Sequence, residues 1–208
     1  MIGSPFIVAV LIGFFLDQQV KGGYDTARVV ESNRYAPLRD HTMIRCKPKG
    51  ICSWNFFLDG EDHHAYLEFN WRGEQGAITA DDTSFEVRKH DVGEWKGIKR
   101  LFGLGIFSGH WTLDLDRESV ASAQKSSAFT RTFEIQNAEG TLLLCAESAG
   151  ARNFRVERSD EVMATISRDH ALTRRATIET LAEKWDFPTI CFAFWLVVLI
   201  WHRAASGS

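Results

Sequence analysis

The feature that most constrains the fold is a C-terminal stretch, Pro188–Trp201, that is apolar on every face. A helix with no polar stripe must be surrounded by apolar groups. Ile190–Trp201 has twelve residues, or about 18 Å of helix, whereas a membrane span needs about 20 residues. Asp186 before the stretch and Arg203 after it suit the helix dipole. The sequence predicts a helix over about 187–203 that is enclosed by protein, and a short membrane tail anchor is the alternative.

Several segments upstream of this helix alternate between apolar and polar residues. In the first of them, Leu67, Phe69 and Trp71 share one face. A period of two is typical of half-buried strands. The predicted strands include Tyr66–Trp71, Ser84–Arg88, Trp111–Asp116, Thr132–Gln136, Leu142–Leu144, Phe154–Glu157 and Val162–Ile166. Leu172–Trp185 is ambiguous between a strand and a short helix.

Turn signals separate these strands, among them Leu58–Gly60, Arg72–Gly76 and Asn137–Gly140. Short strands at this spacing indicate an antiparallel sandwich or barrel. The interior of a closed sheet has to be filled, and an all-apolar helix would fill it. We therefore expect a mainly β protein, an antiparallel barrel over residues 41–205 that encloses the C-terminal helix.

That helix should then supply core side chains. The expected core residues of the helix are Phe192, Phe194, Trp195, Leu196, Val198 and Leu199.

The first 40 residues stand apart from this pattern. Phe6–Leu16 is apolar, but it lacks a preceding Lys or Arg and a small-residue cleavage site. It is also shorter than a membrane span. A signal, an anchor and a buried strand or short helix all stay open for this segment. Four cysteines, one of them Cys191 inside the apolar stretch, do not form a disulfide framework and favour a reducing, cytoplasmic compartment.

The chain resembles the tubby C-terminal-like superfamily, which includes phospholipid scramblases and LURP-one-related proteins. The resemblance covers about residues 43–203. It rests on the paired strands around Trp111–Leu115 and Ser122–Ile135, on the strand pattern of Gly140–Leu144 and Val162–Arg168, and on the terminal apolar helix. It implies a barrel with a central helix and an association with lipids, since tubby-like domains bind phosphoinositides through surface Lys and Arg.

Basic residues gather at two places where a lipid headgroup could bind. Lys125 and Arg131 flank a turn between two strands, so both could reach one phosphate. Lys96, Lys99 and Arg100 precede an apolar loop, Leu101–Phe107, and cations beside exposed apolar groups suit an anionic membrane surface.

Ordinary structural roles compete with each of these hypotheses. An inward-folding turn would account for the loop, and a solvated face would account for the basic residues. The same default applies to Arg152, Arg155 and Arg158, which lie in and beside Phe154–Glu157.

The sequence contains no recognisable catalytic apparatus. There is no G-x-S-x-G motif, P-loop or G-x-G-x-x-G motif. The histidines lack zinc spacing, and Cys46 and Cys52 fit a reduced pair at a turn better than a metal site. We expect neither an enzyme nor a bound metal or cofactor.

The expected partner is an anionic phospholipid, a membrane surface or a protein there. A net charge of −3 argues against nucleic acid. The expected location is the cytoplasm, peripheral to a membrane. A membrane-anchored structural protein and a small-ligand carrier are the alternatives.

Overall fold

The computed structural model describes residues 42–90, 109–126, 131–148, 150, 152–170, 173–181 and 186–207. The described residues belong to one compact unit, and residues 1–30 lie outside them. The loop containing Lys96, Lys99 and Arg100 and the segment Phe6–Leu16 also lie outside them.

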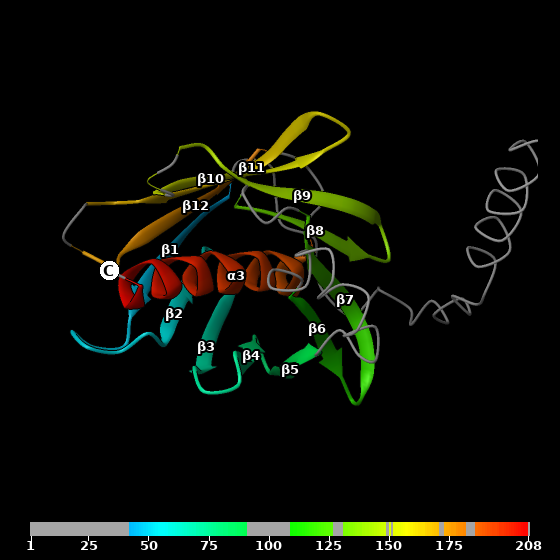
Figure 1. Ribbon diagram of the computed structural model, residues 1–208, viewed down its shortest axis with the longest axis horizontal. Helices are drawn as coiled ribbons and strands as arrows, with labels where there is room; N and C mark the ends of the chain where they lie inside the picture. The colour runs from blue at the N-terminus through cyan, green and yellow to red at the C-terminus, as the bar shows by residue number, and fades with distance from the viewer. Residues whose placement is uncertain are drawn as a thin grey trace, which may run out of the picture. The chain divides into compact units, whose positions relative to one another are not determined.

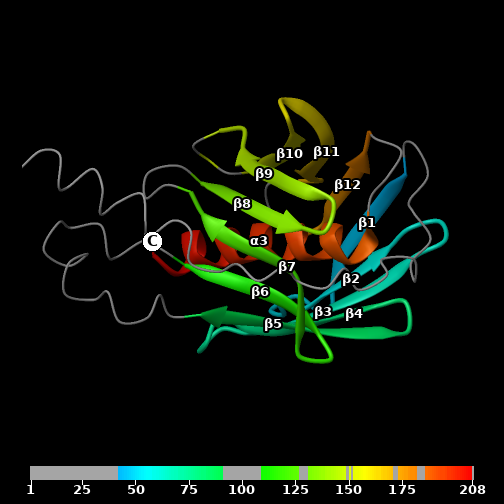
Figure 2. The same ribbon diagram turned by 90° about the vertical axis from the view of Figure 1, so that its right-hand side faces the viewer.

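Twelve antiparallel strands close into a barrel around one helix (Figures 1 and 2). Neighbours in sequence are neighbours in the sheet throughout, and β1 pairs with both β2 and β12 to close it. The strands are β1 Met43–Pro48, β2 Phe56–Asp59, β3 His64–Asn70, β4 Gln75–Ala80, β5 Thr83–His90, β6 His110–Leu115, β7 Glu118–Lys125, β8 Thr132–Asn137, β9 Gly140–Ala146, β10 Asn153–Arg158, β11 Glu161–Arg168 and β12 Ala176–Thr180. The predicted fold class, a β-rich barrel with one central helix, is confirmed.

The helix, α3, spans Phe187–Ser206 and is buried from Phe187 to Trp201. All six side chains expected to be core lie within this buried run. Asp186 is the N-cap, and its carboxylate accepts hydrogen bonds from the Thr189 N–H (3.2 Å) and hydroxyl (2.7 Å). Pro188 lies in the first turn, where its missing N–H leaves no bond unmade.

Small residues on the inner face of the barrel make room for the helix. α3 lies nearest to β3 and β4, where Gly76 and Ala80 alternate with outward residues of β4. Ala121 and Ala123 do the same in β7, and both are buried. The inward-facing side chains of the barrel are thus small where the helix carries large groups such as Trp195.

Tight hairpins connect several strands. Asp116 and Arg117, between β6 and β7, both have positive φ (51° and 73°), and so do Ser159 and Asp160 (50° and 68°) between β10 and β11. Two positive φ values in a two-residue loop match the twist of a hairpin.

The structure adjusts one local prediction from the sequence, overturns a second and resolves a third that the sequence left open. Arg72–Gly76 was expected as a turn, and a turn is present there, but it ends at Glu74 because β4 begins at Gln75. Cys46 is not at a turn, because it is buried inside β1, while Cys52 is exposed; both are free thiols. The ambiguous segment from Leu172 contains a strand, β12.

Candidate functional site

The C-terminal end of α3 reaches one open end of the barrel, which we call the mouth. The connections β1–β2, β3–β4, β7–β8, β9–β10 and β11–β12 and the end of β5 lie at this end, because antiparallel strands place alternate connections on the same side. Arg203 in the last turn of α3 contacts Glu74 of the β3–β4 turn there. Lys125 and Arg131 end β7 and precede β8, respectively, so they lie at the same end.

Six strand ends at the mouth carry a Lys or Arg at a position that continues the inward-facing residues of the strand. In β7, for example, Ala121 and Ala123 face the core and Lys125 is the next residue in that phase. In β8, Arg131 stands two residues before buried Phe133. The six residues are Lys89, Lys125, Arg131, Arg152, Arg168 and Arg174. These cations therefore surround the end of the helix.

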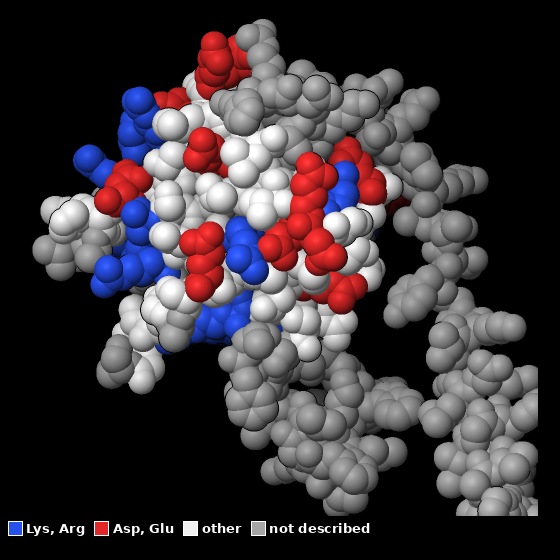
Figure 3. Space-filling view, turned by 90° about the horizontal axis from the view of Figure 1, so that it is seen from above, with Lys and Arg blue, Asp and Glu red and all other residues white. Residues whose placement is uncertain are grey.

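The opposite end of the barrel is acidic. Its turns and strand ends carry Asp59, Glu61, Asp62, Asp81, Asp82, Asp116, Glu118, Glu139, Asp160 and Glu161, against Arg117 and Arg158. In Figure 3, Lys and Arg predominate at the left, where the mouth lies, and Asp and Glu predominate at the right. The small net charge of −3 thus conceals a strong separation of charge along the barrel.

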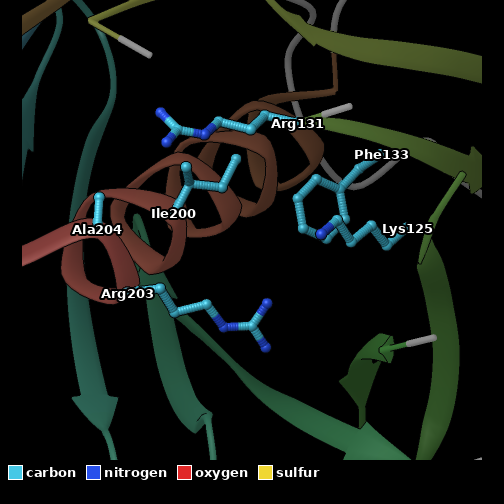
Figure 4. A pocket seen from close by; sticks show the side chains of 6 residues that line it. All are labelled: Lys125, Arg131, Phe133, Ile200, Arg203 and Ala204. Atoms are coloured by element: carbon cyan, nitrogen blue, oxygen red, sulfur yellow. The ribbon is translucent and has the colours of Figure 1, made fainter. Parts of the chain in front are cut away.

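Lys125, Arg131 and Arg203 line one pocket of about 240 Å³ at the mouth, together with Phe133, Ile200 and Ala204. Figure 4 shows Arg131 and Arg203 on two sides of the opening, with Lys125 on the facing strand. We call this the mouth pocket. The structure therefore brings the two residues of the β7–β8 turn together, as the sequence suggested, and adds a third cation from the helix.

The electrostatics of the mouth pocket favour an anion. The pKa of Lys125 is lowered from 10.5, first by burial and then by repulsion from Arg203 and Arg131. An anion between the three cations would relieve this repulsion and favour the charged lysine. The end of α3 opposes this effect, since carbonyl groups give it partial negative charge, but three full charges outweigh about half a charge.

Glu74 is the acidic residue that balances part of this charge. Its carboxylate lies 2.6 Å from Lys89 Nζ and accepts two bonds from Arg203. Burial acts to raise the pKa of Glu74, but the bonds to Lys89 and Arg203 prevail and lower it. Glu74 therefore stays ionised and holds Arg203 beside the pocket.

A stack of aromatic rings runs from the core to the mouth. Trp195 stacks on Phe69 at 5.0 Å, Phe69 on Trp71 at 4.7 Å, and Trp71 on His202 at 3.7 Å. Trp54 contacts Trp71 edge-on at 5.8 Å. Aromatic contacts thus connect the core of the barrel to its basic mouth.

The histidines considered for a metal have other partners. His63 Nδ1 lies 2.9 Å from Asp81, His64 Nδ1 lies 2.8 Å from Asp59, and His90 Nε2 lies 2.9 Å from Thr112. His41 lies outside the described residues. Among the residues that the structure describes, no three His, Cys, Asp or Glu side chains are grouped to hold a metal ion.

Sequence reasoning missed Arg203, Arg168 and Arg174 as members of the site. A usable signal existed for Arg168 and Arg174, because each stands two positions from the apolar face of its strand, whereas Arg203 lies in α3 and is placed by its contact with Glu74. Comparison with protein-family models, with curated proteins and with solved structures finds no match for this chain.

Proposed function

We propose that this protein is a non-enzymatic module that binds the phosphate headgroup of an anionic lipid at a membrane surface. The observation that carries the proposal is that Lys125, Arg131 and Arg203 all line the mouth pocket. Guanidinium groups match the oxygens of a phosphate in pairs, and an ammonium adds a compact charge. The pocket is smaller than a typical drug-sized site, which suits a headgroup.

The separation of charge supports a membrane over a freely diffusing ligand. A bilayer with anionic lipids has a negative surface potential that attracts basic groups within about a Debye length. The same potential repels the acidic end, represented by Asp81, Asp82 and Glu61. The protein would therefore approach with its mouth toward the lipid, as a cytoplasmic, peripheral membrane protein.

A relationship to tubby-like proteins is part of the proposal. The closed barrel with one central helix is compatible with that fold. The basic residues of the mouth pocket are identified from the structure of this chain alone. They are not aligned with the lipid-binding residues of any relative. A protein at the membrane surface that carries anionic groups would be recognised by the same chemistry.

The other candidate functions have less support. α3 is long and apolar enough to cross a membrane, yet 83% of its apolar window is buried inside the barrel. A membrane anchor formed by α3 would leave the barrel empty. A carrier of small apolar ligands would need an interior that α3 occupies instead.

Vesicle binding tests the proposal. Wild-type protein should sediment with phosphatidylcholine vesicles that contain phosphatidic acid or a phosphoinositide, and not with pure phosphatidylcholine vesicles. Lys125→Glu with Arg131→Glu should abolish sedimentation. The unfolding free energy should change little, within about 0.5 kcal/mol per site.

A matched control separates the site from net charge. Arg45→Glu with Arg117→Glu makes the same change in charge at two exposed positions away from the mouth. This control variant should keep most of the binding. The proposal fails if the wild type ignores anionic vesicles, or if both double variants lose binding equally.

A further inference from the structure

A second group of cations lies at the mouth, across the strands β10, β11 and β12. Asn153 pairs with Ser167, so Arg152 and Arg168, the next residues toward the mouth, lie opposite each other at the ends of β10 and β11. On the other side of Arg168, Ala176 is its partner in β12, and Arg174 stands two residues before Ala176. The sheet therefore gathers three arginines that continue the inward faces of three adjacent strands.

Two of these arginines lie on tryptophan rings at the barrel end. The Arg168 guanidinium carbon is 4.4 Å from the centroid of Trp201, and that of Arg174 is 4.3 Å from the centroid of Trp54. Arg174 also donates a hydrogen bond to the Ser53 carbonyl at 2.8 Å. A guanidinium whose face is covered by a ring keeps its N–H edge for other partners, and this stacking fixes its plane.

The charge of this group is not balanced locally. Within the described ranges, none of Arg152, Arg168 and Arg174 has an acidic side chain at ion-pair distance. The nearest acid in sequence, Asp169, accepts a hydrogen bond from Thr177.

The surroundings of Arg168 show the same imbalance. The pKa of Arg168 is lowered by burial and by repulsion from Arg174 and Arg152. Its buried Nε has no hydrogen-bond partner in the described part of the chain. A buried donor without a partner costs free energy, so the barrel holds Arg168 at its end at a cost.

We propose that Arg152, Arg168 and Arg174 form a second anion site, which holds a phosphate group through their guanidinium edges. Three cations favour a phosphate, which carries up to two negative charges and accepts paired hydrogen bonds, over a singly charged carboxylate. The site is distinct from the mouth pocket, because its nearest strand, β10, is two strand spacings from β8, or about 10 Å along the wall. It does not depend on the proposed lipid function, since a free phosphate would satisfy it equally.

Binding of inorganic phosphate tests this site. Equilibrium dialysis should find two phosphates per wild-type protein and one for Arg168→Gln with Arg174→Gln. The pocket variant Lys125→Gln with Arg131→Gln should also bind one. Fluorescence from Trp201 and Trp54 should respond to phosphate in the pocket variant and not in the arginine variant.

Arg155→Gln is the control, since Arg155 is exposed on the outer face of β10 beside Glu157. This control should bind two phosphates. The second site is ruled out if the arginine variant, folded by circular dichroism, keeps the wild-type stoichiometry. If that variant does not fold, Arg152→Gln, at an exposed position, takes its place. It should lower the affinity for one of the two phosphates several-fold. Unchanged affinity in Arg152→Gln would overturn the proposal.

Vesicles with phosphatidic acid then identify the source of the phosphate. If the second site holds a headgroup, the arginine variant should sediment more weakly than wild type. If it holds a soluble phosphate, sedimentation should be unchanged while phosphate stoichiometry falls. A failure of all vesicle binding with two phosphates still bound would reject the lipid function and leave the second site standing.

Discussion

Glu74 binds Arg203 through two hydrogen bonds, from Nε to Oε1 at 2.7 Å and from Nη2 to Oε2 at 2.6 Å. The two residues are 129 positions apart. The pair joins the β3–β4 turn to the last turn of α3, and it fixes the third cation of the mouth pocket. Glu74 is thus both a structural clamp and an internal anion beside a proposed anion site.

Replacing Glu74 by Gln should weaken the fold and strengthen anion binding. Hydrogen bonds between charged groups contribute about 1.5–3 kcal/mol. Because the Arg203 side chain is 38% exposed, solvent screening reduces this value, and we expect a loss of about 1 kcal/mol. Phosphate affinity should rise, since Arg203 loses its internal partner. Chemical denaturation and phosphate titration measure the two effects, and a fall in both would show that Glu74 only shapes the pocket.

The stabilisation by Glu74 should also depend on pH. Its pKa in the folded protein is lowered from 4.5. A group with a lowered folded pKa contributes stability above its unfolded pKa and loses it as the pH falls through the folded value. The difference in melting temperature between wild type and Glu74→Gln should therefore be full near neutral pH and shrink below about pH 4.5. Asp186, whose pKa is raised by burial, is present in both proteins, so its effect cancels in the difference in melting temperature.

Gly76 should tolerate no side chain. A Cβ at this position would overlap the Glu68 carbonyl oxygen and come within 2.9 Å of Trp195 Nε1. Both neighbours are held, one by the β3 backbone and the other by stacking on Phe69. Gly76→Ala should cost about 1–3 kcal/mol, as overpacking does. Gly50→Ala is the control, because nothing lies within 4 Å of its Cβ position, and equal effects of both substitutions would contradict the close approach.

The strands that the sequence predicted are those in which large apolar residues alternate, such as Asn153–Arg158. Those that the alternation missed lack this signal, although the resemblance implied a strand at Ser122. Glu118–Lys125 turns Ala121 and Ala123 inward, and alanines produce a weak alternation. Phe56–Asp59 has only four residues. Such strands are fixed by pairing with neighbouring strands and by the space that α3 needs. A short stretch of sequence shows neither of these constraints.

The site shows the same division between local and distant information. Lys125 and Arg131 flank one hairpin, so their proximity followed from sequence separation alone. The contribution of Arg203 depends on Glu74 and on the length of α3 relative to the barrel. Contacts between residues so far apart arise from closure of the barrel, which no period in the sequence encodes.

The burial of α3 makes its apolar residues essential to the fold. Leu196 is fully buried, and Leu196→Ala should cost about 2–5 kcal/mol. The control Leu143→Ala changes the same side chain on the outer face of β9, where Leu143 is 38% exposed, and it should cost much less. Val198→Asp should cost more free energy of unfolding than either, because it buries a carboxylate without a partner. Urea denaturation of the three variants gives the order directly.

Truncation after Asp186 tests the same dependence more severely. Without α3, the inner faces of twelve strands lose their cover, and the exposed apolar surface should cause aggregation. If α3 were a membrane anchor instead, truncation would release a stable soluble barrel, and Leu196→Ala would hardly affect its unfolding. Expression of the truncated chain, followed by gel filtration and a thermal melt, decides between these outcomes. A monomeric product with a cooperative transition would show that the barrel does not need its helix.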